Sequence, residues 1–330
     1  LSERPIVFIL VRPNRCGIVL PELEQGKLLS SKFPIKTYSY SDDPDYWSEA
    51  FQKATTDMGI SGTTIGIEPS RLRVMEYRFL ENSINHSLFV SAETEISKCR
   101  AVKDDTEIQA MRIATDIAER SLLQILPEIR EGRTEKEIAA RLVCKLLENG
   151  SDTALPFQPI VISGTNSSNP HGTPSDRILQ FGDFVIIDWG AAFNGYCSDI
   201  TRTFVIGQAT EEQKFLYQKV LEANQAGREI SAPGIMSKQV DDACRNVLRK
   251  YNLDNYFIHR TGHGLGLEPH ETPYIHANNP VFLQPGMVYT IEPGIYLPGK
   301  GGIRIEDDIL ITDEGSISLT TLPRELMILK

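Results

Sequence analysis

The chain has 330 residues, of which 41% are hydrophobic and 24% are charged, which is typical of a globular protein long enough for two domains. A formal net charge of −10 argues against nucleic acid or an anionic membrane surface as the main partner, and no hydrophobic run approaches the length of a membrane span. The five cysteines are scattered and form no C-x-x-C motif, which favours reduced thiols and a cytoplasmic location.

Residues 1–103 alternate strand-like and helical segments and predict a small α/β domain. We expect strands at 5–11, 17–20, 63–67 and 87–90, and helices at 44–58 and 70–82. Asp43 and Pro44 open the first helix as N-cap and first helical residue, and Gly59 ends it. Because the chain begins almost directly on a strand, we expect further residues before Leu1.

Residues 104–330 run through helices and then strands twice, which predicts an α+β domain built from a duplicated unit. Helices are expected to begin at the capping-box patterns Asp104-x-x-Glu107, Thr134-x-x-Glu137 and Thr210-x-x-Gln213, and at an N-cap formed by Ser237. Strands are expected at 158–163, 184–189, 200–206, around 263, at 288–295 and at 303–311. A site built from both halves would lie at their shared axis.

The Asn-Gly pair at 194–195 predicts a tight hairpin between two of these strands. With this turn, Asp188 lies opposite Thr201 and diagonal to Asp199, so both carboxylates share one face of the sheet, roughly 7–8 Å apart at the backbone. A slip of one residue would put them on opposite faces. Taken singly, Asp188 would more simply end a strand and Asp199 would cap a turn.

Glu292 and Glu306 flank the turn sequence Leu-Pro-Gly-Lys-Gly-Gly at 297–302. A loop centred on Gly299 places the two glutamates directly opposite each other on antiparallel strands, where they repel unless a cation lies between them. The alternative is a pair of solvent-facing glutamates. Against it, the neighbouring isoleucines make these strands apolar enough to be buried.

His263 lies in the glycine-rich segment 262–266, where the backbone can approach other groups closely. A dinucleotide site is not expected there, because no βαβ unit with an acidic residue on a second strand surrounds the segment. The donors that could converge are Asp188, Asp199, His263, Glu292 and Glu306. Four carboxylates and one imidazole are too much buried negative charge to meet without cations. The set predicts a dinuclear divalent-metal centre, and its imidazole fits Mn, Co, Fe or Zn rather than Mg or Ca.

Two further histidines, His171 and His270, lie in loop segments and fit catalytic roles. One would donate to a tetrahedral oxyanion, and the other would transfer a proton to the leaving nitrogen. Either could instead be an ordinary surface histidine. Cys197 lies two residues before Asp199 and is expected to be a buried, inert thiol.

Six segments carry a resemblance to a known family: IDWG at 187–190, GYCSDITRTF at 195–204, TGHGLGL at 261–267, HETP at 270–273, TIEPG at 290–294 and GIRIEDD at 302–308. Through them, residues 104–330 resemble the pita-bread metallopeptidases, which include aminopeptidase P, prolidase and methionine aminopeptidase. Residues 1–103 resemble the smaller N-terminal α/β domain of the creatinase, prolidase and aminopeptidase P branch. The resemblance implies a catalytic domain with a curved antiparallel sheet.

The resemblance implies that all five donors bind metal, with Asp199 and Glu306 bridging two divalent ions, Mn or Co first and Zn or Fe as alternatives. A hydroxide that bridges the ions would attack the Xaa-Pro bond of peptides or dipeptides, and Glu292 would take the proton. His171 and His270 would serve the substrate and the intermediate, and Arg304 would contact the substrate or a ligand. Proline-containing peptides are the expected partners, and a homodimer is the expected assembly.

One position departs from the prolidase pattern. Prolidases carry an arginine soon after the His-Glu-x-Pro stretch, where it holds the carboxylate of the product proline; here Tyr274 stands at that place and is expected to line the substrate site. This favours use of longer peptides, as in aminopeptidase P. A metal-free creatinase-like amidinohydrolase or a non-catalytic binding module would lack part of the ligand set, which is complete here. Methionine aminopeptidase lacks the N-terminal domain.

Overall fold

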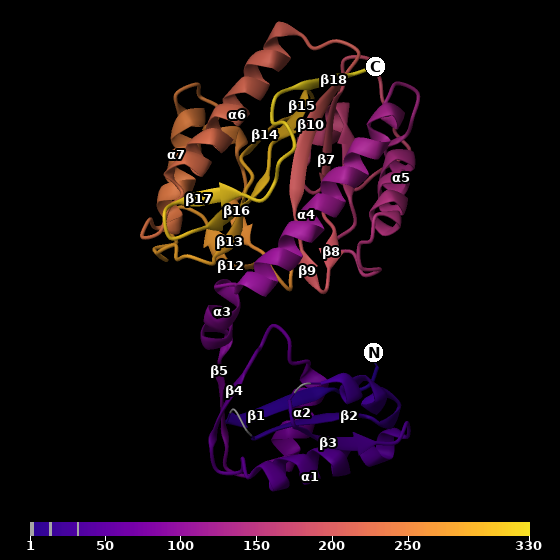
Figure 1. Cartoon of the computed structure of the whole chain (residues 1–330), viewed down its shortest axis with the longest axis vertical. Coiled ribbons are helices and arrows are strands. Elements are labelled where there is room, and N and C mark those ends of the chain that lie inside the picture. Colours follow the sequence, from indigo (N-terminus) through magenta and orange to yellow (C-terminus); the bar gives the residue numbers. More distant parts are fainter. Residues whose placement is uncertain (1–2, 13–14, 32) are drawn as a thin grey trace. The chain divides into compact units, whose positions relative to one another are not determined.

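The computed structural model describes residues 3–12, 15–31 and 33–330 (Figure 1). The chain forms two compact units, Leu1–Ile96 and Ser97–Lys330. Their division falls within α3 (Glu93–Ala101), whereas the sequence placed it at 103/104, before the next helix. A continuous helix carries no break in composition, so the sequence does not mark this point.

The amino-terminal unit contains a three-stranded sheet in the order β1-β2-β3. Strand β1 runs antiparallel to β2, and β3 runs parallel to β2. A parallel pair of strands, β4 and β5, completes the strands described in this unit. The elements are β1 (Val7–Arg12), β2 (Arg15–Pro21), β3 (Ile35–Tyr40), β4 (Thr64–Ile67), β5 (Leu88–Ser91), α1 (Trp47–Met58), α2 (Val74–Ser83) and the 3₁₀ helices η1 (Glu22–Ser30) and η2 (Pro44–Tyr46).

Helix α1 packs its apolar side onto β2 and β3 and makes the core of this unit. Its predicted ends are confirmed: Asp43 Oδ1 accepts from the Asp45 backbone N–H at 3.1 Å, and Gly59 ends the helix with a left-handed φ of 63°. The first turn is 3₁₀ rather than α. The second helix begins at Val74, later than the predicted residue 70.

The carboxy-terminal unit has two helix pairs, α4 with α5 and α6 with α7, and Figure 1 shows each pair beside the strands of its own half. The helices are α4 (Asp105–Ile125), α5 (Glu135–Glu148), α6 (Glu211–Ile230) and α7 (Ser237–Arg249), with 3₁₀ turns η3 (Leu126–Glu128), η4 (Gly164–Ser168) and η5 (Asp254–Tyr256). The three predicted capping boxes are present. The prediction for Ser237 is wrong: Met236 is the N-cap of α7, and Ser237 donates its hydroxyl to the Val281 carbonyl instead.

The strands of this unit form two principal sheets, ordered β18-β10-β7-β6 and β12-β11-β13-β16-β17. Two small hairpins, β8–β9 and β14–β15, extend the pairs β7–β10 and β13–β16. The strands are β6 (Ile160–Ser163), β7 (Phe184–Trp189), β8 (Ala192–Phe193), β9 (Tyr196–Cys197), β10 (Ile200–Ile206), β11 (Gly262–Gly264), β12 (Glu271–Ile275), β13 (Val288–Ile291), β14 (Gly294–Leu297), β15 (Gly301–Arg304), β16 (Asp307–Ile311), β17 (Ser316–Ser318) and β18 (Met327–Leu329). Each half therefore has two helices and a strand–hairpin–strand segment.

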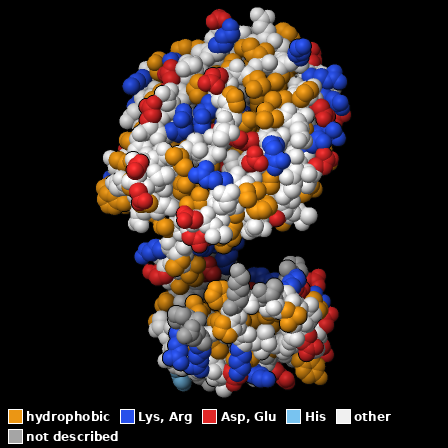
Figure 2. Space-filling view, in the orientation of Figure 1, with side chains coloured by type: hydrophobic (Ala, Val, Ile, Leu, Met, Phe, Trp, Pro, Cys, Tyr) orange, Lys and Arg blue, Asp and Glu red, His pale blue; other side chains and the backbone are white. Residues whose placement is uncertain are grey.

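Each half has its own hydrophobic core. One core joins α4 and α5 to β6, β7 and β10, and the other joins α6 and α7 to β13, β14, β15 and β16. Among the described residues, no helix is both long and apolar enough to cross a membrane. On the face of this unit seen in Figure 2, acidic and basic side chains are interspersed.

Candidate metal centre

The four acidic residues predicted as metal ligands lie at corresponding points of the two halves. Asp188 is the next-to-last residue of β7, and Asp199 immediately precedes β10. In the other half, Glu292 immediately follows β13, and Glu306 immediately precedes β16. Each half thus supplies one carboxylate at the end of a strand and one at the start of its antiparallel partner.

The register of β7 and β10 is the one that the Asn-Gly turn predicts. Asp188 lies opposite Thr201, which makes it the diagonal neighbour of Asp199. In the turn, Asn194 and Gly195 have φ values of 51° and 81°, as a tight hairpin turn of this kind requires. The register prediction is confirmed, and it places the two aspartates on a common face.

In the second half, the pairing of β13 with β16 and the pairing of β14 with β15 have the same register, and Glu292 and Glu306 lie between these two pairs of strands. Ile291 pairs with Asp307, and the same offset continues through β14 and β15, so the two glutamates stand opposite each other. Glu306 also forms an isolated antiparallel bridge with Thr201, and its backbone N–H donates to the Thr201 carbonyl at 3.1 Å. This bridge joins the two halves at the site.

His263 and three of the carboxylates converge. Ligand atoms of Asp199, His263 and Glu306 lie within 4.8 Å of one another, and all three residues are buried. His263 Nε2 lies 3.7 Å from Asp199 Oδ2 and 3.5 Å from Glu292 Oε1. Its Nδ1 lies 3.2 Å from the Gly264 carbonyl, and donation there leaves the Nε2 lone pair facing the carboxylates.

Asp188, the fifth predicted ligand, is connected to this group through Arg304 and Thr201. Arg304 Nη2 donates to Asp188 Oδ2 at 2.5 Å, and Arg304 Nε donates to Thr201 Oγ1 at 3.1 Å. Thr201 Oγ1 in turn donates to Glu306 Oε2 at 2.6 Å. Among the described residues, Asp188 Oδ1 is buried and has no hydrogen-bond partner. That oxygen is available to a bound ion.

The electrostatics of the cluster are unfavourable without a cation. Burial, together with the neighbouring carboxylates, raises the pKa of Asp199 and of Glu306 well above the ordinary range. Burial raises the pKa of Glu292 to about 7. Burial also lowers the pKa of His263 well below its usual value, which keeps its imidazole neutral. Without cations, protons would neutralise part of the buried charge. Metal ions bind the neutral imidazole and the ionised carboxylates, so a bound cation would replace these protons.

Two residues at this centre, His259 and Tyr296, have no assigned role from the sequence. Tyr296 Oη accepts from Arg304 Nη1 at 2.8 Å and lies 2.8 Å from His259 Nε2. Burial lowers the pKa of His259 to about 3, so its neutral ring can donate from Nδ1 to the Arg260 carbonyl at 2.7 Å and accept from Tyr296. The local sequence gives no signal for Tyr296, because its partners come from another strand and a loop.

The two histidines predicted to serve the substrate lie at the edge of this centre. The ring centroids of His270 and His263 are 4.1 Å apart in an edge-to-face arrangement, and His270 itself is exposed. Partial burial of the ring and the charges of Arg260 and His171 lower the pKa of His270. His171 is also exposed, and the carbonyl of its neighbour Pro170 accepts from Arg304 Nη1 at 3.3 Å. Both histidines are therefore open to a ligand.

Tyr274 also lies next to the proposed ligands, since it pairs with His263 across β11 and β12. The Arg260 guanidinium lies over its ring, 4.6 Å from the centroid. Cys197 is buried, and burial raises the pKa of its thiol to about 12, in agreement with an inert thiol.

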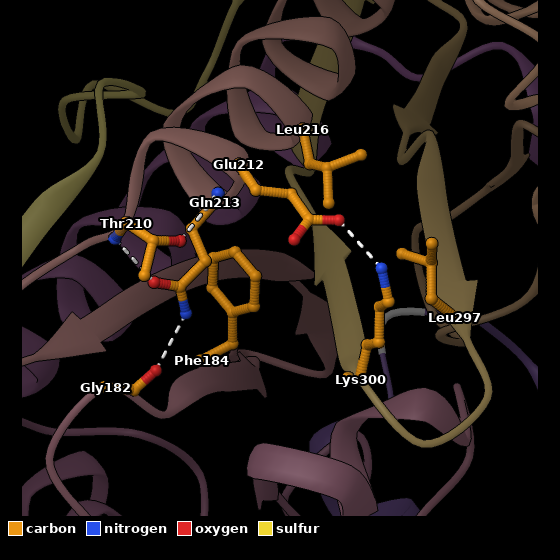
Figure 3. Close-up of a pocket in the computed structure, with 9 residues that line it drawn as sticks. Gly182, Phe184, Thr210, Glu212, Gln213, Leu216, Leu297 and Lys300 are labelled. Atoms are coloured by element: carbon orange, nitrogen blue, oxygen red, sulfur yellow. Dashed lines mark hydrogen bonds and ion pairs between the residues drawn. The ribbon is translucent and has the colours of Figure 1, made fainter.

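A separate cavity of about 300 Å³ lies between the start of α6 and the tip of the β14–β15 hairpin (Figure 3). None of the predicted site residues lines it. Lys300 Nζ donates to Glu212 at 2.8 Å across it, and Gln213 Nε2 donates to the Gly182 carbonyl at 2.7 Å. Its polar side chains thus bond within the protein.

The donor set fits divalent transition-metal ions. It offers carboxylate oxygens and one imidazole nitrogen, which suit Mn, Co, Fe and Zn. The carboxylates are buried, two have strongly raised pKa values, and Asp188 Oδ1 lacks a protein partner. A bound cation would offset the buried negative charge, lower the raised pKa values and give Asp188 Oδ1 a partner.

Comparisons with known proteins agree with this chemistry. The model of metallopeptidase family M24 matches residues 109–313. The chain is 37% identical over 324 residues to an Xaa-Pro dipeptidase of Pyrococcus furiosus, covering 97% of this chain and 88% of that protein. Among solved structures, it resembles a prolidase of Thermococcus sibiricus with a TM-score of 0.92 and 37% identity, covering 99% and 88% of the two chains. It resembles an X-Pro aminopeptidase of Thermotoga maritima with a TM-score of 0.88 and 34% identity, covering 98% and 88%.

The carboxy-terminal unit therefore has the pita-bread fold of the prolidases and X-Pro aminopeptidases. The chain belongs to metallopeptidase family M24.

Proposed function

We propose that this protein hydrolyses the Xaa-Pro peptide bond with two divalent metal ions held by Asp188, Asp199, His263, Glu292 and Glu306. The observation that carries this proposal is the buried cluster of carboxylates around His263, in which burial and the neighbouring carboxylates raise the pKa of Asp199 and of Glu306. Relatives and structural neighbours named as Xaa-Pro dipeptidase, prolidase and X-Pro aminopeptidase support the choice of substrate.

When bound, the ions would supply Lewis acidity that activates a water molecule and polarises the scissile carbonyl, with Asp199 and Glu306 as bridging ligands. Glu292 would take a proton from the attacking water and pass it on. His270 and His171, which are exposed beside the centre, would donate to the carbonyl oxygen and to the leaving nitrogen. Arg304 holds Asp188 in place through its bond to Oδ2.

Manganese or cobalt is the proposed metal, with zinc or iron as alternatives, because imidazole and carboxylate together suit these ions. A homodimer in the cytoplasm is the proposed working form. The proposed division of the chain is a creatinase/prolidase-type N-terminal domain at 1–103 and a catalytic domain at 104–330.

The test starts with protein that has been stripped by a chelator and reloaded with Mn²⁺ or Co²⁺. The reloaded protein is expected to cleave Ala-Pro or Ala-Pro-Ala, and Asp199→Ala and Glu306→Ala are expected to abolish cleavage. Asp176→Ala is the matched control, because Asp176 is exposed and pairs with Lys136 at the surface. Elemental analysis without metal, together with no cleavage after reloading, would refute the proposal. Hydrolysis of creatine in place of the peptides would favour an amidinohydrolase.

A further inference from the structure

Arg260 carries a positive charge beside the metal centre that the protein does not neutralise. Within the part of the chain that the structure describes, its guanidinium forms no hydrogen bond and no ion pair, and it lies over the face of the Tyr274 ring. By contrast, the nearby Arg245 bonds to Asp241 and to two backbone carbonyls. Arg260 is only half-buried, so its donors can reach a ligand.

The position of Arg260 relates it to the groups proposed to act on the substrate. It precedes β11 by two residues, and Tyr274, which supports it, stands opposite His263 on β12. After burial, the charge of Arg260 is the next cause that lowers the pKa of His270. Its charge also acts on Glu292. Arg260 therefore lies on the tyrosine that pairs with His263, and the His263 ring is 4.1 Å from that of His270.

We propose that Arg260, stacked on Tyr274, binds the C-terminal carboxylate of the substrate and so makes the protein selective for Xaa-Pro dipeptides. A guanidinium presents a planar fork of donors that matches a carboxylate, and the aromatic face restricts its orientation. A longer peptide offers only a neutral amide at this point. The inference rests on the proposed function, because it concerns the substrate of that reaction.

Tyr274 supports the guanidinium of Arg260 and so takes part in the proposed selection of dipeptides. From the resemblance alone, we expect Tyr274 to favour longer peptides. In the structure, the neighbouring segment supplies an arginine whose side chain lies over that tyrosine. Position 260 thus supplies a positive charge directly over Tyr274.

The test compares Ala-Pro with its amide, Ala-Pro-NH₂, which differs from it only by the loss of the terminal charge. The wild type is expected to prefer the acid. Arg260→Gln is expected to raise KM for the acid about 10- to 100-fold and to leave KM for the amide within about twofold, since only the acid offers a carboxylate. Arg260→Lys is expected to keep part of the preference. The control is Arg249→Gln, an exposed arginine of α7 that bonds to Asn246.

A second measurement does not depend on turnover. Calorimetric titration is expected to show that L-proline binds the wild type more tightly than L-prolinamide, and that Arg260→Gln removes this difference. Equal loss for acid and amide in Arg260→Gln, or a wild type that treats both alike, would overturn the inference and leave the proposed function standing. If the wild type cleaves neither peptide, the proposed function fails, and the proline titration alone decides the role of Arg260.

Discussion

Thr201 allows a direct test of the link between the two halves of the site. Its buried hydroxyl donates to Glu306 Oε2 at 2.6 Å and accepts from Arg304 Nε at 3.1 Å, so Thr201→Val removes two hydrogen bonds to charged groups at nearly constant volume. At about 2 kcal/mol for each such bond, we expect the free energy of unfolding to fall by about 4 kcal/mol in protein saturated with Mn²⁺. Metal affinity is expected to fall about 10- to 100-fold, because Glu306 loses the group that orients it. Denaturant unfolding and a metal titration give the two quantities.

Thr203→Val is the matched control. Thr203 is also buried in β10, but among the described residues its hydroxyl bonds to backbone groups alone, the carbonyl and the N–H of Arg304, at 2.8 and 3.0 Å. Two neutral hydrogen bonds predict a loss of about 2 kcal/mol. The difference in free energy of unfolding between the two variants should narrow in chelator, because burial raises the pKa of Glu306 and so favours the neutral form of its side chain over the charged one. Equal losses in Mn²⁺ and unchanged metal affinity would refute this account of Thr201.

Three further predictions concern the charges of the centre. Asp199→Asn is expected to lose its bound metal, as measured by elemental analysis. In chelator the variant is expected to be more stable than the wild type by about 1–2 kcal/mol, because one buried carboxylate is gone. Lower stability in chelator would contradict this prediction. Arg304→Lys is expected to lower the free energy of unfolding by about 3 kcal/mol, since an ammonium cannot reach all three side-chain partners of Arg304 at once. A loss below about 1 kcal/mol would argue against this role of Arg304. Burial raises the pKa of Glu292 to about 7, against about 4.3 in an unfolded chain. The folded, metal-free protein therefore binds this proton more tightly than the unfolded chain, and the stability that results at low pH is lost as pH rises through about 7. The free energy of unfolding, measured in chelator between about pH 5 and pH 8, is expected to fall with rising pH. A free energy of unfolding that rises with pH would contradict this prediction.

The sequence predicts much of the fold because its local signals are strong where tertiary packing agrees with them. Strands β7 and β10 have the predicted bounds, and the turn at Asn194 fixes their register. Strand β3 escapes prediction, since its lysine, threonine, serine and two tyrosines look polar although Tyr38 and Tyr40 are buried. Ser237 looks like an N-cap, but the strand-like backbone of Met236 and the nearby Val281 carbonyl decide otherwise.

At the site, parity within each hairpin predicts which carboxylates share a face, and the structure brings Asp199, Glu306 and His263 together. Contacts between segments far apart in the chain lie beyond such reasoning. The bridge between Thr201 and Glu306 joins the two halves, and the contact of Arg260 with Tyr274 joins a loop to a strand. Neither has a periodic signal in the sequence, because each depends on how separate hairpins pack.

The central claim is that this chain holds two metal ions. Equilibrium dialysis of chelator-treated protein against Mn²⁺, followed by elemental analysis, measures the number of ions bound per chain. The account predicts two ions for the wild type and loss of both in Glu306→Gln, because Glu306 is the proposed bridging ligand whose Oε2 is also oriented by Thr201. A wild type that binds no ion, or a Glu306→Gln variant that binds as many ions as the wild type, would contradict it.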